Sequence, residues 1–153
     1  MKYSNDRDLY LKVFTEIAKL HDDVDYRKKH NALTFHIKGA RAKQYPAVTV
    51  GAMYDQILEF GNHHSPAYMK GLHDEIINEF HKKLYCGVND YTPLCHNAVG
   101  HCAENYAASK VLKQVGVYQA TLPPLSDIHF SYAFRPRIWK KVEWCKICVT
   151  MFS

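Results

Sequence analysis

Residues 100–109 read GHCAENYAAS, and they open a segment whose apolar spacing predicts a helix over residues 102–116. Gly116 is a typical stop at the C-terminus of such a helix. A cysteine, a glutamate and an asparagine crowd the first turn, although a glutamate is costly to bury and an asparagine disfavours helix interiors. The polar cluster at this helix start therefore needs a chemical explanation.

A second short stretch supplies one. Residues 144–152 read WCKICVTMF and are expected to begin a helix directly after a strand over residues 128–134 and a basic loop over residues 135–143. Cys102 at one helix start, with Cys145 and Cys148 at the other, would bring three thiols to one ion, and the positive helix ends favour their thiolate forms.

Three thiolates suit zinc and leave a fourth position for water, as in catalytic sites. Glu104, two residues after Cys102, is then placed to exchange protons with a zinc-bound water. Two other interpretations stay open. A structural zinc site would take a fourth ligand from Cys95, His96 or His101, and a redox pair is disfavoured because no opening βαβ pattern precedes residues 144–148. Five cysteines are a poor disulfide framework.

The order Cys102-Ala103-Glu104 and then Cys145-x-x-Cys148 matches the signature of zinc deaminases with an all-cysteine ligand set. The chain resembles the cytidine-deaminase-like superfamily over residues 95–152. Its stretches GHCAENYAAS, LSDIHFSYAFRPR and WCKIC are similar to the deaminase domains that end bacterial polymorphic toxins. It departs from the usual pattern at Trp144, where the family has proline, and at Cys102, where the pattern has histidine.

The resemblance implies an α/β, cytidine-deaminase-like layered fold: one domain over residues 1–153, with a small mixed sheet flanked by helices and shortened after the Cys-x-x-Cys helix. It implies hydrolytic deamination of cytosine to uracil in DNA, at a single-stranded or flipped-out base, with Glu104 as proton shuttle. The backbone N–H of Ala103 would meet the base edge, and Asn97 and His101 would line the pocket. A deaminase of free nucleosides, nucleotides or RNA is the enzymatic alternative, and a zinc-stapled nucleic-acid-binding module is the non-enzymatic one.

The charge distribution favours an anionic partner. The net charge is +5, and the whole excess follows Glu104, where seven basic residues meet two acidic ones. Arg135 and Arg137 are expected to grip phosphates, and the aromatic residues among these charges to stack on unpaired bases. These aromatic residues are Tyr106, Tyr132, Phe134, Trp139 and Trp144. A solvated basic face is the alternative interpretation.

The rest of the chain predicts a helix over residues 6–22, strands over 32–39 and 44–51 joined by a hairpin, and helices over 52–61 and 65–85. His63 and His64 are expected at the surface, with a nucleic-acid contact as the alternative. The first residues are too polar for a signal peptide, and no apolar run reaches membrane-spanning length. We therefore expect action in the cytoplasm. The resemblance to toxin domains further implies delivery as the C-terminal domain of a secreted bacterial toxin, with a cognate immunity protein as partner.

Overall fold

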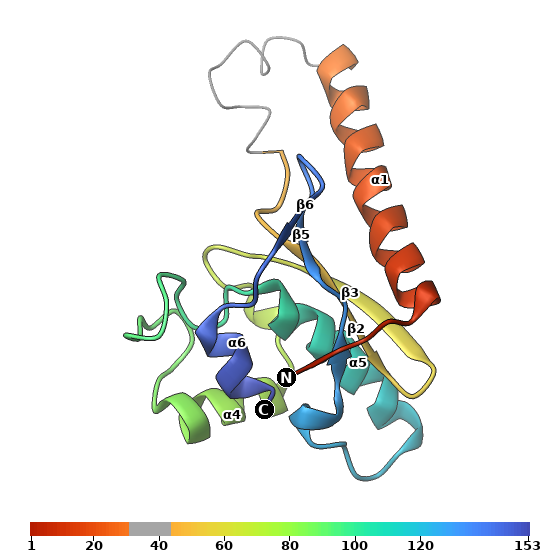
Figure 1. The fold of residues 1–153 in the computed structure, drawn as a ribbon. Coiled ribbons are helices and arrows are strands. Elements are labelled where there is room, and N and C mark those ends of the chain that lie inside the picture. Colours follow the sequence, from red (N-terminus) through yellow and green to blue (C-terminus); the bar gives the residue numbers. More distant parts are fainter. Residues whose placement is uncertain (31–43) are drawn as a thin grey trace.

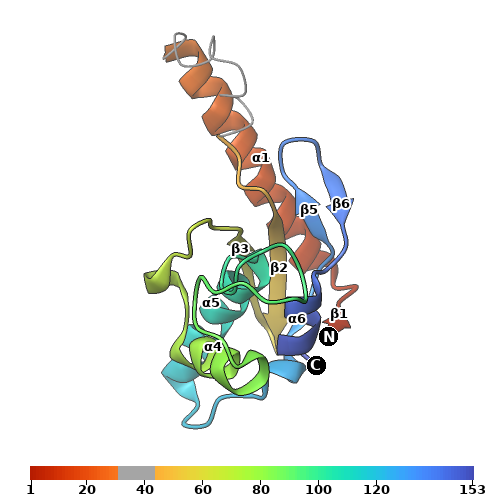
Figure 2. The same cartoon turned by 90° about the vertical axis from the view of Figure 1, so that its left-hand side faces the viewer.

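A computed structural model describes residues 1–30 and 44–153, and it shows a curled mixed sheet with helices on both faces (Figures 1 and 2). The sheet runs in the order β1-β4-β2-β5-β6, and β3 pairs with the other edge of β2. Among the strands of the described residues, only β1 and β4 pair in parallel. The strands are β1 (Lys2–Tyr3), β2 (Thr49–Tyr54), β3 (Ile57–Asn62), β4 (His129–Phe130), β5 (Ala133–Arg135) and β6 (Lys140–Val142).

Helix α1 (Arg7–His30) covers one face of the sheet (Figure 1). The carboxylate of Asp6 caps it by accepting a hydrogen bond from the Leu9 N–H at 2.9 Å. Its apolar positions recur every three to four residues, so one stripe faces the sheet. The buried members of that stripe are Leu9, Val13, Ile17 and Val24. The predicted helix is confirmed, and it continues eight residues beyond the predicted end at residue 22.

Helix α5 (Ala103–Tyr118) covers the opposite face and packs on β2 and β3. Gly61 allows this close approach, because a Cβ built there would lie 2.3 Å from the backbone nitrogen of Ala107. Gly51, on the other face, leaves room for Leu9 and Val13 of α1 in the same way. The sheet is therefore held between two helices that contact its backbone closely.

The helix predicted over residues 52–61 is wrong, because these residues form the β2–β3 hairpin. Thr49 pairs with Asn62 and Tyr54 with Ile57, and Asp55 turns the chain with φ +53°. Alanine, methionine, leucine and glutamate favour helices when isolated, but a sheet edge between α1 and α5 overrides that preference. The strand predicted over residues 44–51 begins only at Thr49, and the strand over 32–39 with its hairpin lies outside the described residues.

The helix predicted over residues 65–85 is confirmed only in its second half. A short 3-10 turn (Met69–Gly71) comes first, and the cap of α4 (Asp74–Glu79) is His73, whose Nδ1 accepts from the Glu75 N–H, rather than Ser65. A π-helical turn (Phe80–Leu84) continues α4. The chain then runs to residue 102 without a helix or strand, as the turn-forming residues predict.

The C-terminal segment has the predicted order of elements, but its predicted strand is interrupted. After a 3-10 turn (Leu125–Asp127), the strand predicted over residues 128–134 is split into β4 and β5. The predicted basic loop forms β6 in its second half, and Trp139 in the turn has φ +57°. Helix α6 (Lys146–Met151) starts where predicted. No helix of the described residues is long and apolar enough to span a membrane.

Candidate metal centre

Three cysteine thiols meet where α5 and α6 begin. Cys102 and Cys145 are the residues that precede these two helices, each in an extended conformation, and neither thiol caps its own helix. Cys148 lies in the first turn of α6. The sulfur of Cys145 lies 3.3 Å from that of Cys102 and 3.6 Å from that of Cys148, and all three lie within 4.8 Å of one another. The predicted cluster is therefore present, and it could hold a metal ion.

The electrostatics of the cluster fit a cation. Cys102 and Cys148 are buried, and Cys145 is half-buried. Hydrogen bonding to Cys145 raises the pKa of the Cys102 thiol, and hydrogen bonding from Cys102 and then Cys148 lowers the pKa of Cys145. The three thiols thus shift one another's pKa values in opposite directions. A divalent ion would stabilise all three thiolates, because buried charges need a counter-charge.

Glu104 lies beside the cluster without belonging to it. Its side chain is buried, with 4% of the residue exposed, and the Cys148 thiol donates to its Oε2 at 3.5 Å. Burial raises the pKa of this carboxyl to about 7. A carboxyl with this pKa can both take up and release a proton near neutral pH, which general acid–base chemistry requires.

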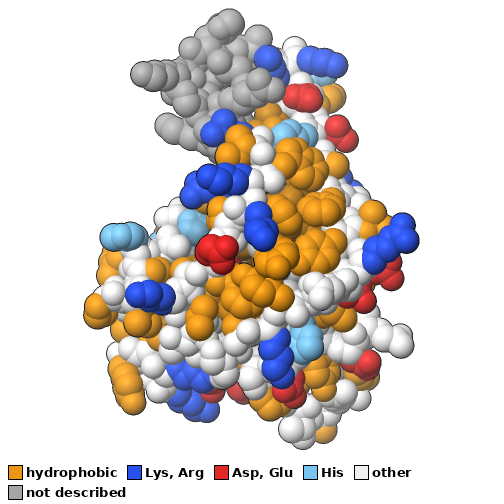
Figure 3. Space-filling model, in the orientation of Figure 1, with side chains coloured by type: hydrophobic (Ala, Val, Ile, Leu, Met, Phe, Trp, Pro, Cys, Tyr) orange, Lys and Arg blue, Asp and Glu red, His pale blue; other side chains and the backbone are white. Residues whose placement is uncertain are grey.

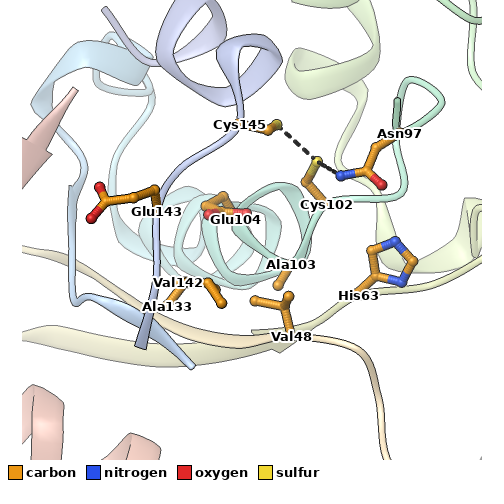
Figure 4. Close-up of a pocket in the computed structure, with 10 residues that line it drawn as sticks. All are labelled: Val48, His63, Asn97, Cys102, Ala103, Glu104, Ala133, Val142, Glu143 and Cys145. Carbon is orange, nitrogen blue, oxygen red and sulfur yellow. Dashed lines mark hydrogen bonds between the residues drawn. The ribbon is translucent and has the colours of Figure 1, made fainter. Parts of the chain in front are cut away.

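A cavity of about 50 Å³ opens beside Cys102, Glu104 and Cys145 (Figure 4). By volume it can take several water-sized groups. The remaining lining residues are Val48, His63, Asn97, Ala103, Ala133, Val142 and Glu143. The side-chain amide of Asn97 lies 4.0 Å from the Cys102 sulfur. Ala103 and Asn97 therefore lie where the sequence analysis expects substrate contacts.

His63 is the pocket residue that the sequence analysis undervalued. Its N–H donates to the Val48 carbonyl at 2.9 Å, and this contact continues the β2–β3 pairing. Burial, and then the nearby His101, lower the pKa of His63, so its imidazole is neutral at pH 7. Recognition of the hairpin in the sequence would have placed His63 beside Val48, but its turn lacks the usual Asn-Gly signal.

His101 does not line the cavity. Its Nε2 hydrogen-bonds to Oδ1 of Asn89 at 2.7 Å, and its ring meets that of His63 edge to face at 5.9 Å. It lies outside the thiol cluster, as does every other histidine, cysteine or carboxylate of residues 1–30 and 44–153. Cys95 comes nearer than His101: its thiol interacts with that of Cys145 and accepts from the Asn97 N–H at 3.4 Å.

The predicted aromatic residues pack on other aromatic rings of the protein and do not line the cavity. Trp144 stacks on Tyr3 at 3.5 Å, Tyr132 lies 4.4 Å from the same ring, and Phe134 meets Phe14 of α1. Figure 3 shows a continuous hydrophobic area over α1 and the β5–β6 hairpin. Trp144, Tyr132 and Phe134 are therefore engaged with other aromatic side chains, and none of them lines the cavity.

Arg135 and Arg137 line a separate cavity of about 310 Å³, with Tyr45, Pro46, Ala47, Pro136 and Ile138. Residues 45–47 lead directly into Val48 of the metal-centre cavity, and β5 connects Ala133 of that cavity to Arg135. The arginines thus lie next to the centre along both segments, but not in it.

Comparison with known proteins adds no further constraint on this site. No protein-family model, curated protein or solved structure matches the chain.

Proposed function

We propose that this protein is a zinc-dependent hydrolytic deaminase that converts cytosine to uracil in DNA, with a cytidine-deaminase-like fold. One observation carries the proposal. Three clustered thiols and a buried carboxyl with a pKa near 7 come from the starts of two helices and meet at one small cavity. The small mixed sheet with helices on both faces is also compatible with the fold that the resemblance implies.

Cys102, Cys145 and Cys148 would hold the zinc ion, since thiolates are its preferred soft ligands. When bound, zinc supplies the Lewis acidity that activates water at neutral pH. Glu104 accepts a proton from the attacking water and delivers it to the ring nitrogen. It then carries the second proton to the departing amine. A C–O bond forms at C4, the C–N bond breaks, and ammonia leaves.

The cavity walls suit a planar base with a polar edge. Val48, Ala133 and Val142 supply apolar surface, and the Asn97 amide and the Ala103 backbone supply hydrogen-bonding groups. The neutral imidazole of His63 adds a further donor or acceptor. In this proposal Ala103 and Asn97 contact the base, while His101 positions His63 through their ring contact.

A structural zinc site is the second candidate, and Cys95 is the observation that favours it. Its thiol lies near enough to that of Cys145 for the two to affect each other's pKa, and this candidate takes Cys95 as the fourth thiolate ligand. Four protein ligands close a zinc site and leave no position for water. Cys95→Ser separates the two candidates: a catalytic three-thiolate site keeps its zinc and its activity, whereas a four-thiolate site loses affinity for zinc.

The direct test is incubation of zinc-quantified protein with single-stranded DNA, the matching duplex, RNA of the same sequence and free deoxycytidine. Uracil formed in DNA is read by uracil-specific cleavage, and product mass reads the other substrates. The proposal expects uracil in DNA from the unmutated protein and not from Glu104→Gln at equal zinc content. Equal conversion by both proteins would refute the role of Glu104, and turnover of RNA or free deoxycytidine alone would refute DNA as the substrate.

A further inference from the structure

A second basic cavity lies on the outer side of α5, apart from the one that holds the two arginines. It has a volume of about 360 Å³ and lies between the end of β3, the 3-10 turn and the middle of α5. We call it the lysine cleft. Its lining residues are Gly61, Asn62, His64, Tyr68, Lys70, Gly71, Tyr106, Lys110 and Lys113.

The positive charge of the lysine cleft is not neutralised by an ion pair. Within residues 1–30 and 44–153, neither Lys70, Lys110 nor Lys113 pairs with a carboxylate. The Lys113 ammonium donates to the Lys70 carbonyl at 3.3 Å, which brings the chain segments of two of the lysines together. Such a concentration of charge around one hollow favours a bound anion.

Lys110 lines the cleft, and its ammonium also contacts an aromatic ring of β3. Its ammonium lies 3.8 Å from the centre of the Phe60 ring. Burial lowers the pKa of Lys110, while the carboxylates of Glu59 and Glu16 raise it and the charge of Lys12 lowers it. Glu59 is itself engaged by the side-chain amide of Gln114.

The cleft adjoins the metal centre through consecutive residues. His63 lines the metal-centre cavity, and His64 lines the lysine cleft. The His64 N–H donates to the His101 carbonyl at 3.0 Å, and its ring packs on that of Tyr106, one turn after Ala103. A strand with one base at the metal centre would therefore have its neighbouring nucleotides within reach of the cleft.

The cleft also offers a ring for an unpaired base. Tyr68 is 52% exposed, and its backbone is fixed because its N–H donates to the Tyr106 hydroxyl at 2.8 Å. An exposed aromatic ring beside several lysines is typical of sites that bind single strands, where rings stack on bases and lysines follow the backbone. A duplex would offer only its backbone to this ring.

We infer that the lysine cleft binds the phosphodiester backbone of a single-stranded nucleic acid, next to the nucleotide whose base enters the metal-centre cavity. This inference rests on the proposed function, since it names how the polymer substrate is held. Lys70, Lys110 and Lys113 contact phosphates, and Tyr68 stacks on an adjacent base.

The test measures binding of a fluorescein-labelled single-stranded DNA by Glu104→Gln protein at a series of NaCl concentrations. Lys70, Lys110 and Lys113 are changed together to alanine. The matched control changes Lys2, Lys28 and Lys29, which are exposed elsewhere and pair with no carboxylate of the described residues. Loss of three phosphate contacts lowers the slope of log affinity against log salt by about 2. The loss of affinity between 50 and 200 mM salt should therefore be roughly twentyfold smaller for this triple variant than for the protein that keeps its lysines. Equal slopes for the two triple variants would overturn the inference.

Two further arms keep the result interpretable. Lys113→Glu alone changes one exposed side chain and leaves the fold intact, so it must also weaken binding. Tyr68→Ala should weaken the binding of single-stranded DNA about tenfold and the binding of duplex DNA much less. If deoxycytidine monophosphate displaces the labelled strand at equal phosphate concentration, the cleft is a mononucleotide site. This result would overturn the inference that it binds a polymer. If no substrate yields uracil, the proposed function fails, and the salt slope of the silent protein still decides the inference.

Discussion

Gly61→Ala tests whether the contact between β3 and α5 positions the candidate site. A Cβ at this position would lie 2.3 Å from the Ala107 nitrogen and 2.4 Å from the Ala103 carbonyl oxygen. Both are backbone atoms, so no side chain can turn away to make room. Helix α5 must retreat from the sheet by about 1 Å before the contacts reach the ordinary range.

The cost follows from that displacement. Overpacking of a core costs about 1–3 kcal/mol, and the rigid backbone on both sides places Gly61→Ala near 3 kcal/mol. For a chain of 153 residues the unfolding entropy is roughly 0.3 kcal/mol per kelvin, so Tm should fall by roughly 9 °C. Helix α5 also carries Ala103 and Glu104, and a shift of 1 Å at reacting groups costs about a hundredfold in rate.

Urea and thermal unfolding followed by circular dichroism measure the effect, with Gly116→Ala as the matched control. Gly116 is exposed on α5, and the nearest atom to its Cβ would be 3.9 Å away on Leu122. Alanine there should stabilise the helix by about 0.5–1 kcal/mol. A Gly61→Ala protein within about 0.5 kcal/mol of the unmutated one would refute the reasoning, as would equal losses from both substitutions.

Asp6→Ala should cost about 1 kcal/mol in urea unfolding, because it removes the cap on the Leu9 N–H; an unchanged midpoint would show that the cap contributes nothing. Cys148→Ser should lose zinc and lower Tm to that of zinc-free protein, because metal binding and folding are coupled; full zinc content by mass spectrometry would remove Cys148 from the ligand set. Arg135→Ala with Arg137→Ala should raise the KM for single-stranded DNA and leave turnover of free deoxycytidine unchanged. An unchanged KM would show that the cavity lined by these arginines does not contact the DNA.

Local patterns predicted the parts of the site that come from short, self-contained segments. The start of α5 and the start of α6 follow from apolar spacing, and the cysteines then fall at the first turns. The convergence of the two starts needs the intervening strands to return the chain to the same edge. That expectation came from the placement of the three cysteines at two helix starts, and the sulfur positions confirm it.

The pocket wall could not be predicted in the same way. Val48 and His63 meet only because β2 and β3 pair, and residues 52–61 carry helix-favouring side chains that hide the hairpin. The lysine cleft brings Lys70 together with Lys110 and Lys113, which follow it about forty positions later in the chain. The basic excess that the sequence shows after Glu104 therefore includes Lys110 and Lys113 but not Lys70.

The opening cluster of polar residues is only partly explained. Cys102 belongs to the thiol cluster, and Glu104 has the burial and pKa that a proton shuttle needs. Asn105 is fully buried, and its side-chain amide has no hydrogen-bond partner among the described residues.

The most direct test of the central claim compares Glu104→Gln with Glu143→Gln, since both carboxylates line the same cavity. Only Glu104 is buried beside the thiols, whereas Glu143 is exposed. The measurement is the initial rate of uracil formation in single-stranded DNA at equal zinc content. The account predicts that Glu104→Gln is slower than Glu143→Gln by at least about a hundredfold. Equal rates for the two variants, with zinc bound in both, would contradict it.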